Sequence, residues 1–124
     1  MQDQMKRFLD ATPGISLLAY GDLSSGLILN SASRVACPRE VLDLIGEKVT
    51  SSFSRLYPES LARAAEASGS SASIIHFTER SAQIFARLPG DADEVICAVC
   101  DSGADLQPLL GAVQDLAGRL AGPE

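Results

Sequence analysis

The chain has 124 residues, of which 46% are hydrophobic and 21% are charged, a balance that predicts a folded protein and excludes a disordered one. This length suits one domain with a real core, so we expect a single domain over residues 1–124. The formal net charge of −6 disfavours nucleic acid and anionic membranes as partners.

The first part of the chain predicts a helix followed by a β-hairpin. A short amphipathic helix is expected before Thr12-Pro13-Gly14, because proline and glycine both end helices. Strands are expected at Ile15–Tyr20 and Leu27–Ser31, joined by a polar, glycine-flanked loop typical of a hairpin. Since Ile15–Tyr20 is apolar at nearly every position, it should lie inside the sheet.

A second helix is predicted from Pro38 to Leu56. Leu44 does not fit the amphipathic pattern of this helix, because it projects among the charged residues. A single exposed leucine usually has no consequence, but it can mark a contact surface. Gly46 costs about 1 kcal/mol relative to alanine, which indicates either a close packing contact or simple tolerance. The apolar arc of this helix contains Val41, Leu42, Ile45, Val49, Phe53 and Leu56.

The second half predicts three strands and a last helix. A short helical piece is expected at Glu59–Ala67, and strands at Ser73–Thr78 and Ala82–Leu88. The unbroken apolar run Val95–Cys100 predicts a central strand covered on both faces. Asp105 is a good N-cap for a C-terminal helix. The apolar face of that helix is predicted to hold Leu106, Leu109, Leu110, Val113, Ala117 and Leu120. The order α-β-β-α-β-β-β-α predicts an α/β fold of the α+β type.

The candidate reactive residues do not form a recognisable site. Cys97 and Cys100 have the spacing of redox and zinc motifs, but residues three apart in a strand point to opposite faces, so both are expected to be buried structural cysteines. His76 is the single histidine and lacks enough partners for zinc. No phosphate-binding glycine motif occurs. We therefore expect no catalytic residue, no metal, no cofactor and no enzymatic activity.

The number of cysteines indicates the cellular compartment. The chain has three cysteines, and this odd number argues against a disulfide framework and fits a reducing compartment. The N-terminal residues lack the apolar core of a signal peptide, and no apolar run approaches the roughly 20 residues that span a bilayer. The expected location is the cytoplasm.

Two blocks of the chain carry a family resemblance. They read PGISLLAYGDLSSGLILNSAS, a hairpin entered by Pro13-Gly14, and VICAVCDSGADLQPLLGAVQDLAGRL, a strand, a short turn and the last helix. The chain resembles a Roadblock/dynein light-chain domain over essentially Gln2 to Leu120. It departs from the family at Pro108 and in the helix-like insert Glu59–Ser71. The resemblance implies one five-stranded, mostly antiparallel sheet of the profilin-like or longin-like type.

The resemblance also implies a non-catalytic function based on pairing. In the family the third strands of two subunits lie edge to edge with the second helices crossing over them, and the pair binds or regulates a small Ras-like GTPase or anchors a motor or signalling assembly. The partner would be a second copy or a paralogous chain. Ser73–Thr78 contains neither lysine nor proline, the usual protection of an edge strand. The expected interface residues are Val41, Leu44, Ile45, Lys48, Ser52, Ile74, Ile75, His76 and Phe77.

Two other function classes remain open at this point. A small-molecule-sensing domain of similar sheet-and-helix build would need a concave apolar pocket with a few polar groups. A small enzyme would need polar residues that converge in a cleft.

Overall fold

The computed structural model describes residues 2–34, 36–56, 73–77, 81–88, 93–101 and 103–121. The predicted element order is confirmed, except that the helical piece expected at Glu59–Ala67 lies outside the described residues. The elements are α1 (Gln2–Ala11), β1 (Ile15–Asp22), β2 (Leu27–Ser33), α2 (Arg39–Leu56), β3 (Ser73–Phe77), β4 (Ala82–Arg87), β5 (Glu94–Cys100) and α4 (Leu106–Ala121).

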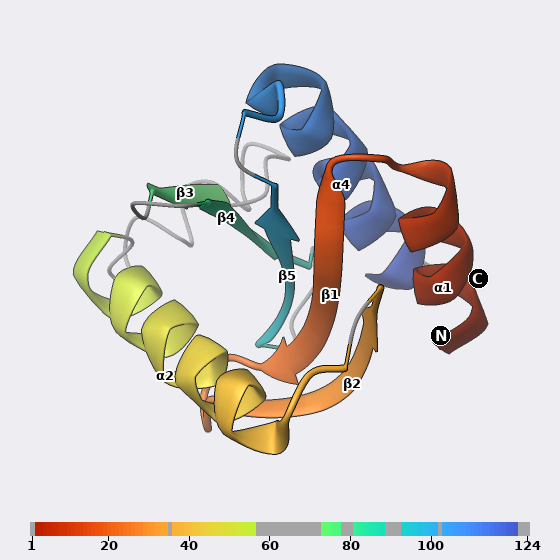
Figure 1. The fold of residues 1–124 in the computed structure, drawn as a ribbon. Helices are drawn as coiled ribbons and strands as arrows, with labels where there is room; N and C mark the ends of the chain where they lie inside the picture. The colour runs from red at the N-terminus through yellow and green to blue at the C-terminus, as the bar shows by residue number, and fades with distance from the viewer. Residues whose placement is uncertain are drawn as a thin grey trace.

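The strands form one antiparallel sheet in the order β2-β1-β5-β4-β3. The central position predicted for the run Val95–Cys100 is confirmed, and so is the interior position of β1. Figure 1 shows α1 and α4 on one side of the sheet and α2 on the other. The two edges of the sheet are β2 and β3, so each leaves one side of its backbone unpaired within the sheet.

Both faces of β5 are buried, which explains its unbroken apolar run. Ile96 and Cys100 belong to the core cluster on the side of α1 and α4, whereas Val95 and Cys97 belong to the cluster on the side of α2. The expectation that Cys97 and Cys100 point to opposite faces is confirmed, because side chains alternate along a strand. Both thiols are free.

A glycine–glycine contact holds α2 against the β1–β2 hairpin. A Cβ atom on Gly46 would lie 2.0 Å from the carbonyl oxygen of Gly26. Gly26 itself has a φ of 74°, which side chains rarely tolerate. One turn further along α2, Thr50 Oγ1 donates a hydrogen bond to the carbonyl of Leu23 at 3.1 Å. Of the two explanations for Gly46, close packing is therefore the right one.

The hairpin strands are longer than predicted. β1 runs on to Asp22 and β2 to Ser33, which shortens the loop to residues 23–26. The pairing continues because Asp22 faces Leu27 in the ladder. The Asp22 carboxylate also accepts hydrogen bonds from the hydroxyls of Ser24 and Ser25, and these bonds close the turn locally.

Two predictions of helix burial were incomplete. Val41 was assigned to the core-facing arc of α2, but 41% of it is exposed, because the first turns of the helix stand over a hollow. In α4 the predicted apolar face omitted Leu116. Only 1% of this side chain is exposed, and it belongs to the core on the side of α1 and α4. In the described ranges every helix falls short of the length and hydrophobicity that a bilayer crossing needs.

Candidate interaction surface along α2 and β3

The flank of α2 that faces β3 is open. Because α2 is held at the β1–β2 hairpin, it leaves space above the other half of the sheet. One hollow of about 450 Å³, here called the β3 hollow, lies between the middle of α2 and the edge strand. It is lined by Leu44, Glu47, Lys48, Ser51, Ser52 and His76.

A second hollow of about 380 Å³, here called the N-terminal hollow, lies beneath the first half of α2. It is walled by residues of β1, β2, β4, β5 and α2. Leu44 and Lys48 line both hollows, so the two adjoin along the same flank of the helix. The residues around the N-terminal hollow are Ser16, Leu17, Ser33, Ala36, Cys37, Pro38, Val41, Leu44, Ile45, Lys48, Gln83 and Val99.

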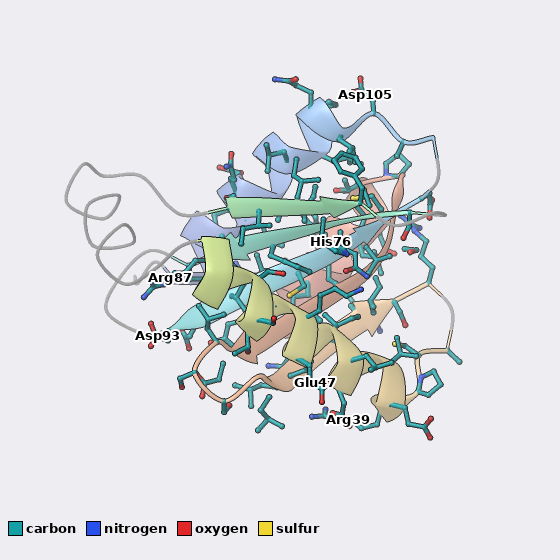
Figure 2. All side chains as sticks on the ribbon, turned by 90° about the vertical axis from the view of Figure 1, so that its left-hand side faces the viewer. Arg39, Glu47, His76, Arg87, Asp93 and Asp105 are labelled. Carbon is teal, nitrogen blue, oxygen red and sulfur yellow. The ribbon has the colours of Figure 1, made fainter. Side chains whose placement is uncertain are left out.

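The side chains of β3 alternate between the two faces of the sheet. Ile74 is buried on the side of α2, and His76 lines the β3 hollow on that same side, where Figure 2 shows it above α2. Ile75 packs against the core on the side of α1 and α4. Phe77, at the end of the strand, is 68% exposed. A large apolar side chain thus stands in solvent at the edge of the sheet.

The two edges of the sheet differ in how they are covered. On β2 the carbonyl of Ser31 accepts a hydrogen bond of 2.7 Å from Gln2 Nε2, so α1 satisfies part of that edge. At β3 the ladder to β4 uses one side of the backbone, and β3, like β2, contains neither lysine nor proline, so the cover that α1 gives to β2 is what separates the two edges. Of the two edges, β3 is therefore the better template for a further strand.

The residues expected at the interface fall into three groups. Val41, Leu44 and Lys48 line the hollows along α2, and Leu44 is 63% exposed, as its position among the charged residues predicts. Ile45 and Ser52 are buried but form part of the walls of the hollows. Of the β3 residues, Ile74 and His76 lie on the face towards α2, whereas Ile75 lies on the face away from it.

The charges along α2 are unevenly paired. Arg39 and Asp43 form an exposed i,i+4 ion pair of 3.2 Å on the outer side of the first turns. Lys48 is half-buried and forms no ion pair with any residue in the described part of the chain. The positively charged side chain of Lys48 therefore lines both hollows and has no acidic partner among the described residues.

Comparison with models of protein families and with curated proteins finds no match. Among solved structures, the chain is similar to MglB in a tetrameric arrangement, with a TM-score of 0.72 and 20% identity over 96% of this chain and 83% of that one. It is also similar to the gliding protein MglB of Thermus thermophilus, with a TM-score of 0.71 and 19% identity over 96% and 84% of the two chains. For a Roadblock/LC7 domain from Streptomyces avermitilis the TM-score is 0.65, with 14% identity over 97% and 93%.

The chain has the Roadblock fold. The resemblance noted in the sequence and the fold class that it implies are both confirmed, including the single five-stranded antiparallel sheet and the order of the elements. In the Roadblock fold described here, the candidate surface is formed by the edge strand β3 and the open flank of α2.

Two of the three thiols in this Roadblock fold, those of Cys97 and Cys100, are buried and poorly suited to chemistry. Burial raises the pKa of the Cys97 thiol to about 12, and burial together with Asp101 raises the pKa of Cys100 to about 11, so neither is a thiolate near neutral pH. Tyr20 donates a hydrogen bond to Glu94, and burial and this carboxylate raise the Tyr20 pKa far above its usual value. Within the described ranges, no three histidine, cysteine, aspartate or glutamate side chains come together as metal ligands.

The contribution of β4 and β5 to the surface was not predicted from the sequence, and neither was that of Cys37. Gln83 and Val99 come from β4 and β5, and Cys37 precedes α2, yet all three line the N-terminal hollow. The sequence does contain a signal for Gln83. Residues two apart in a strand lie on the same face, and Phe85, two residues further along β4, faces α2, so the polar Gln83 side chain also lies on that face. Its Oε1 is buried and has no hydrogen-bond partner among the described residues. A polar side chain at that position indicates that α2 does not cover β4 completely.

Proposed function

We propose that this protein is a non-catalytic interaction module that pairs with a second copy, or with a paralogous chain, through β3 and the open flank of α2. The paired surface binds and regulates a small Ras-like GTPase. The observation that carries the proposal is the juxtaposition of an uncovered edge strand with a hollow whose rim bears the exposed Leu44.

The physical argument for pairing starts from the edge of the sheet. A second β3 added antiparallel would satisfy backbone groups that β4 leaves free, and two sheets would join into one. Such pairing brings the second α2 over the β3 hollow, where it would cover Leu44, and Phe77 would be shielded at the strand end. Together these two side chains give the surface an apolar anchor on the helix and another on the strand.

The similar proteins support self-association and not the identity of the partner. One solved structure of this fold is described as MglB with a tetrameric arrangement, so a protein with this fold assembles with itself. The GTPase rests on the Roadblock resemblance, whose family members pair and regulate Ras-like GTPases. The acidic net charge of −6 suits a GTPase surface with exposed basic residues.

The test of pairing is the solution mass of two variants and one matched control. Leu44→Lys and Phe77→Lys each place a charge on the proposed interface, and both residues are exposed in the single chain, so the fold should survive. Leu29→Lys is the control, since Leu29 is 52% exposed on the opposite edge strand. By light scattering we expect dimer mass for the wild type and the control, and monomer mass for the two variants. A monomeric wild type at all concentrations refutes pairing with a second copy and leaves only pairing with a paralogous chain.

The test of the partner uses a purified small Ras-like GTPase. Calorimetry with the GDP-bound and the GTP-analogue-bound forms should show binding that differs between the two nucleotides, and the monomeric Phe77→Lys variant should bind more weakly. Equal heats in both nucleotide states, or none, would remove the GTPase from the proposal while leaving the pairing in place.

A further inference from the structure

The N-terminal hollow has the size and lining of a small-molecule site. Its volume of about 380 Å³ lies within the range of pockets that hold small ligands, which begins at roughly 300 Å³. The wall is mainly apolar, with Leu17 and Val99 of the sheet opposite Val41 of the helix. Burial of a ligand's carbon chain against such a wall is favourable, because it removes apolar surface from water.

The polar groups of this hollow select the charge of a ligand. Lys48 is the single charged side chain among the described residues that line it, and it has no ion-pair partner in the described ranges. Gln83 adds an amide whose buried Oε1 lacks a partner there, whereas the Ser16 hydroxyl already donates to the Val99 carbonyl at 3.3 Å. A half-buried lysine beside an apolar wall favours a compound with one negative charge and an apolar body.

We infer that the N-terminal hollow binds a small organic carboxylate with an apolar body of a few carbons. The carboxylate pairs with the Lys48 ammonium, and the apolar body lies between Val41 of α2 and Val99 of β5. A neutral compound of the same shape lacks the ion pair, and a cation is repelled by Lys48.

Binding of the carboxylate does not require pairing of two chains. The N-terminal hollow is built from one chain, although it shares Leu44 and Lys48 with the β3 hollow. A second copy whose side chains fill the N-terminal hollow would compete with the carboxylate. Solution mass is therefore measured in every binding experiment, so that loss of pairing and loss of ligand binding are recorded separately.

Cys37 provides a direct reporter of occupancy. It is half-buried and lines the hollow, while Cys97 is 1% exposed and Cys100 is fully buried, so an alkylating reagent reaches Cys37 first in the native protein. The probes are hexanoate, its uncharged analogue hexanamide, and hexylamine. We expect hexanoate to slow alkylation of Cys37 in a saturable manner, hexanamide to act only at higher concentration, and hexylamine to have no effect.

Lys48→Met tests the ion pair, and Lys6→Met is the matched control because Lys6 is an exposed lysine on α1, across the sheet. Lys48→Met should weaken hexanoate binding by about 3- to 5-fold and make hexanoate and hexanamide equivalent, since a partly exposed ion pair contributes modestly. Lys6→Met should bind hexanoate as the wild type does. The inference is overturned if hexanoate protects Cys37 neither in the wild type nor in the monomeric Phe77→Lys variant, or if hexanamide protects Cys37 as well as hexanoate does in the wild type.

Discussion

The contact between Gly46 and Gly26 predicts that two glycine-to-alanine substitutions in helices will have opposite effects. By helix propensity alone, alanine stabilises a helix by about 1 kcal/mol relative to glycine. At Gly46, however, the new methyl group would lie 2.0 Å from the Gly26 carbonyl oxygen, whereas real Cβ contacts are not shorter than 3.0 Å. The difference of about 1 Å must be met by moving backbone, because the obstacle is a carbonyl and not a flexible side chain.

Gly111 in α4 is the matched control. A Cβ on Gly111 meets nothing within 4 Å, so Gly111→Ala should show the full propensity gain of about 1 kcal/mol. Overpacking costs about 1–3 kcal/mol, so Gly46→Ala should be less stable than Gly111→Ala by about that amount. Subtracting one variant from the other removes the propensity contribution, which the two share, and isolates the cost of the contact.

The assay is urea denaturation followed by far-ultraviolet circular dichroism, with the free energy of unfolding extrapolated to water. All variants are compared at one protein concentration, because pairing would make the apparent stability depend on concentration. If Gly46→Ala is stabilised as much as Gly111→Ala, α2 is not held by the hairpin and the explanation for the open flank fails. A displaced α2 should also change the reactivity of Cys37, which lines the N-terminal hollow.

Three further outcomes are expected. In the native protein a thiol reagent should modify Cys37 alone and reach Cys97 and Cys100 only after unfolding, because burial raises the Cys97 pKa to about 12 and the Cys100 pKa to about 11; fast labelling of three thiols would contradict this. Arg34→Ala should lower the free energy of unfolding by about 2 kcal/mol, since the guanidinium donates hydrogen bonds to carbonyls of α1, the loop that follows it and β1. Hydrogen bonds from serine hydroxyls lower the pKa of Asp22, so the ionised Asp22 carboxylate should stabilise the fold above about pH 4. This stabilisation should be lost as the pH falls through the lowered pKa of Asp22, and Asp22→Asn should lack this pH dependence.

The edge position of β3 and the exposure of Leu44 were predictable from the sequence together with the family resemblance. The absence of lysine and proline from Ser73–Phe77 is a local property, and Leu44 stands out because its neighbours on the helix surface are charged. The contribution of Gln83 and Val99 was not predictable, because it depends on which half of the sheet α2 covers. That half is chosen by a contact between residues 20 positions apart in the chain, Gly26 and Gly46.

Local periodicity in the amino-acid sequence was enough to establish the order of helices and strands, the central strand and the separation of Cys97 from Cys100. These properties follow from the spacing of side chains along a helix or a strand, and that spacing is the same wherever the element lies. The hollows along α2 came from the packed molecule, since the N-terminal hollow takes its walls from α2 and four strands, and the β3 hollow takes its walls from α2 and β3. A space between elements has no residue of its own, so no pattern along one chain records it.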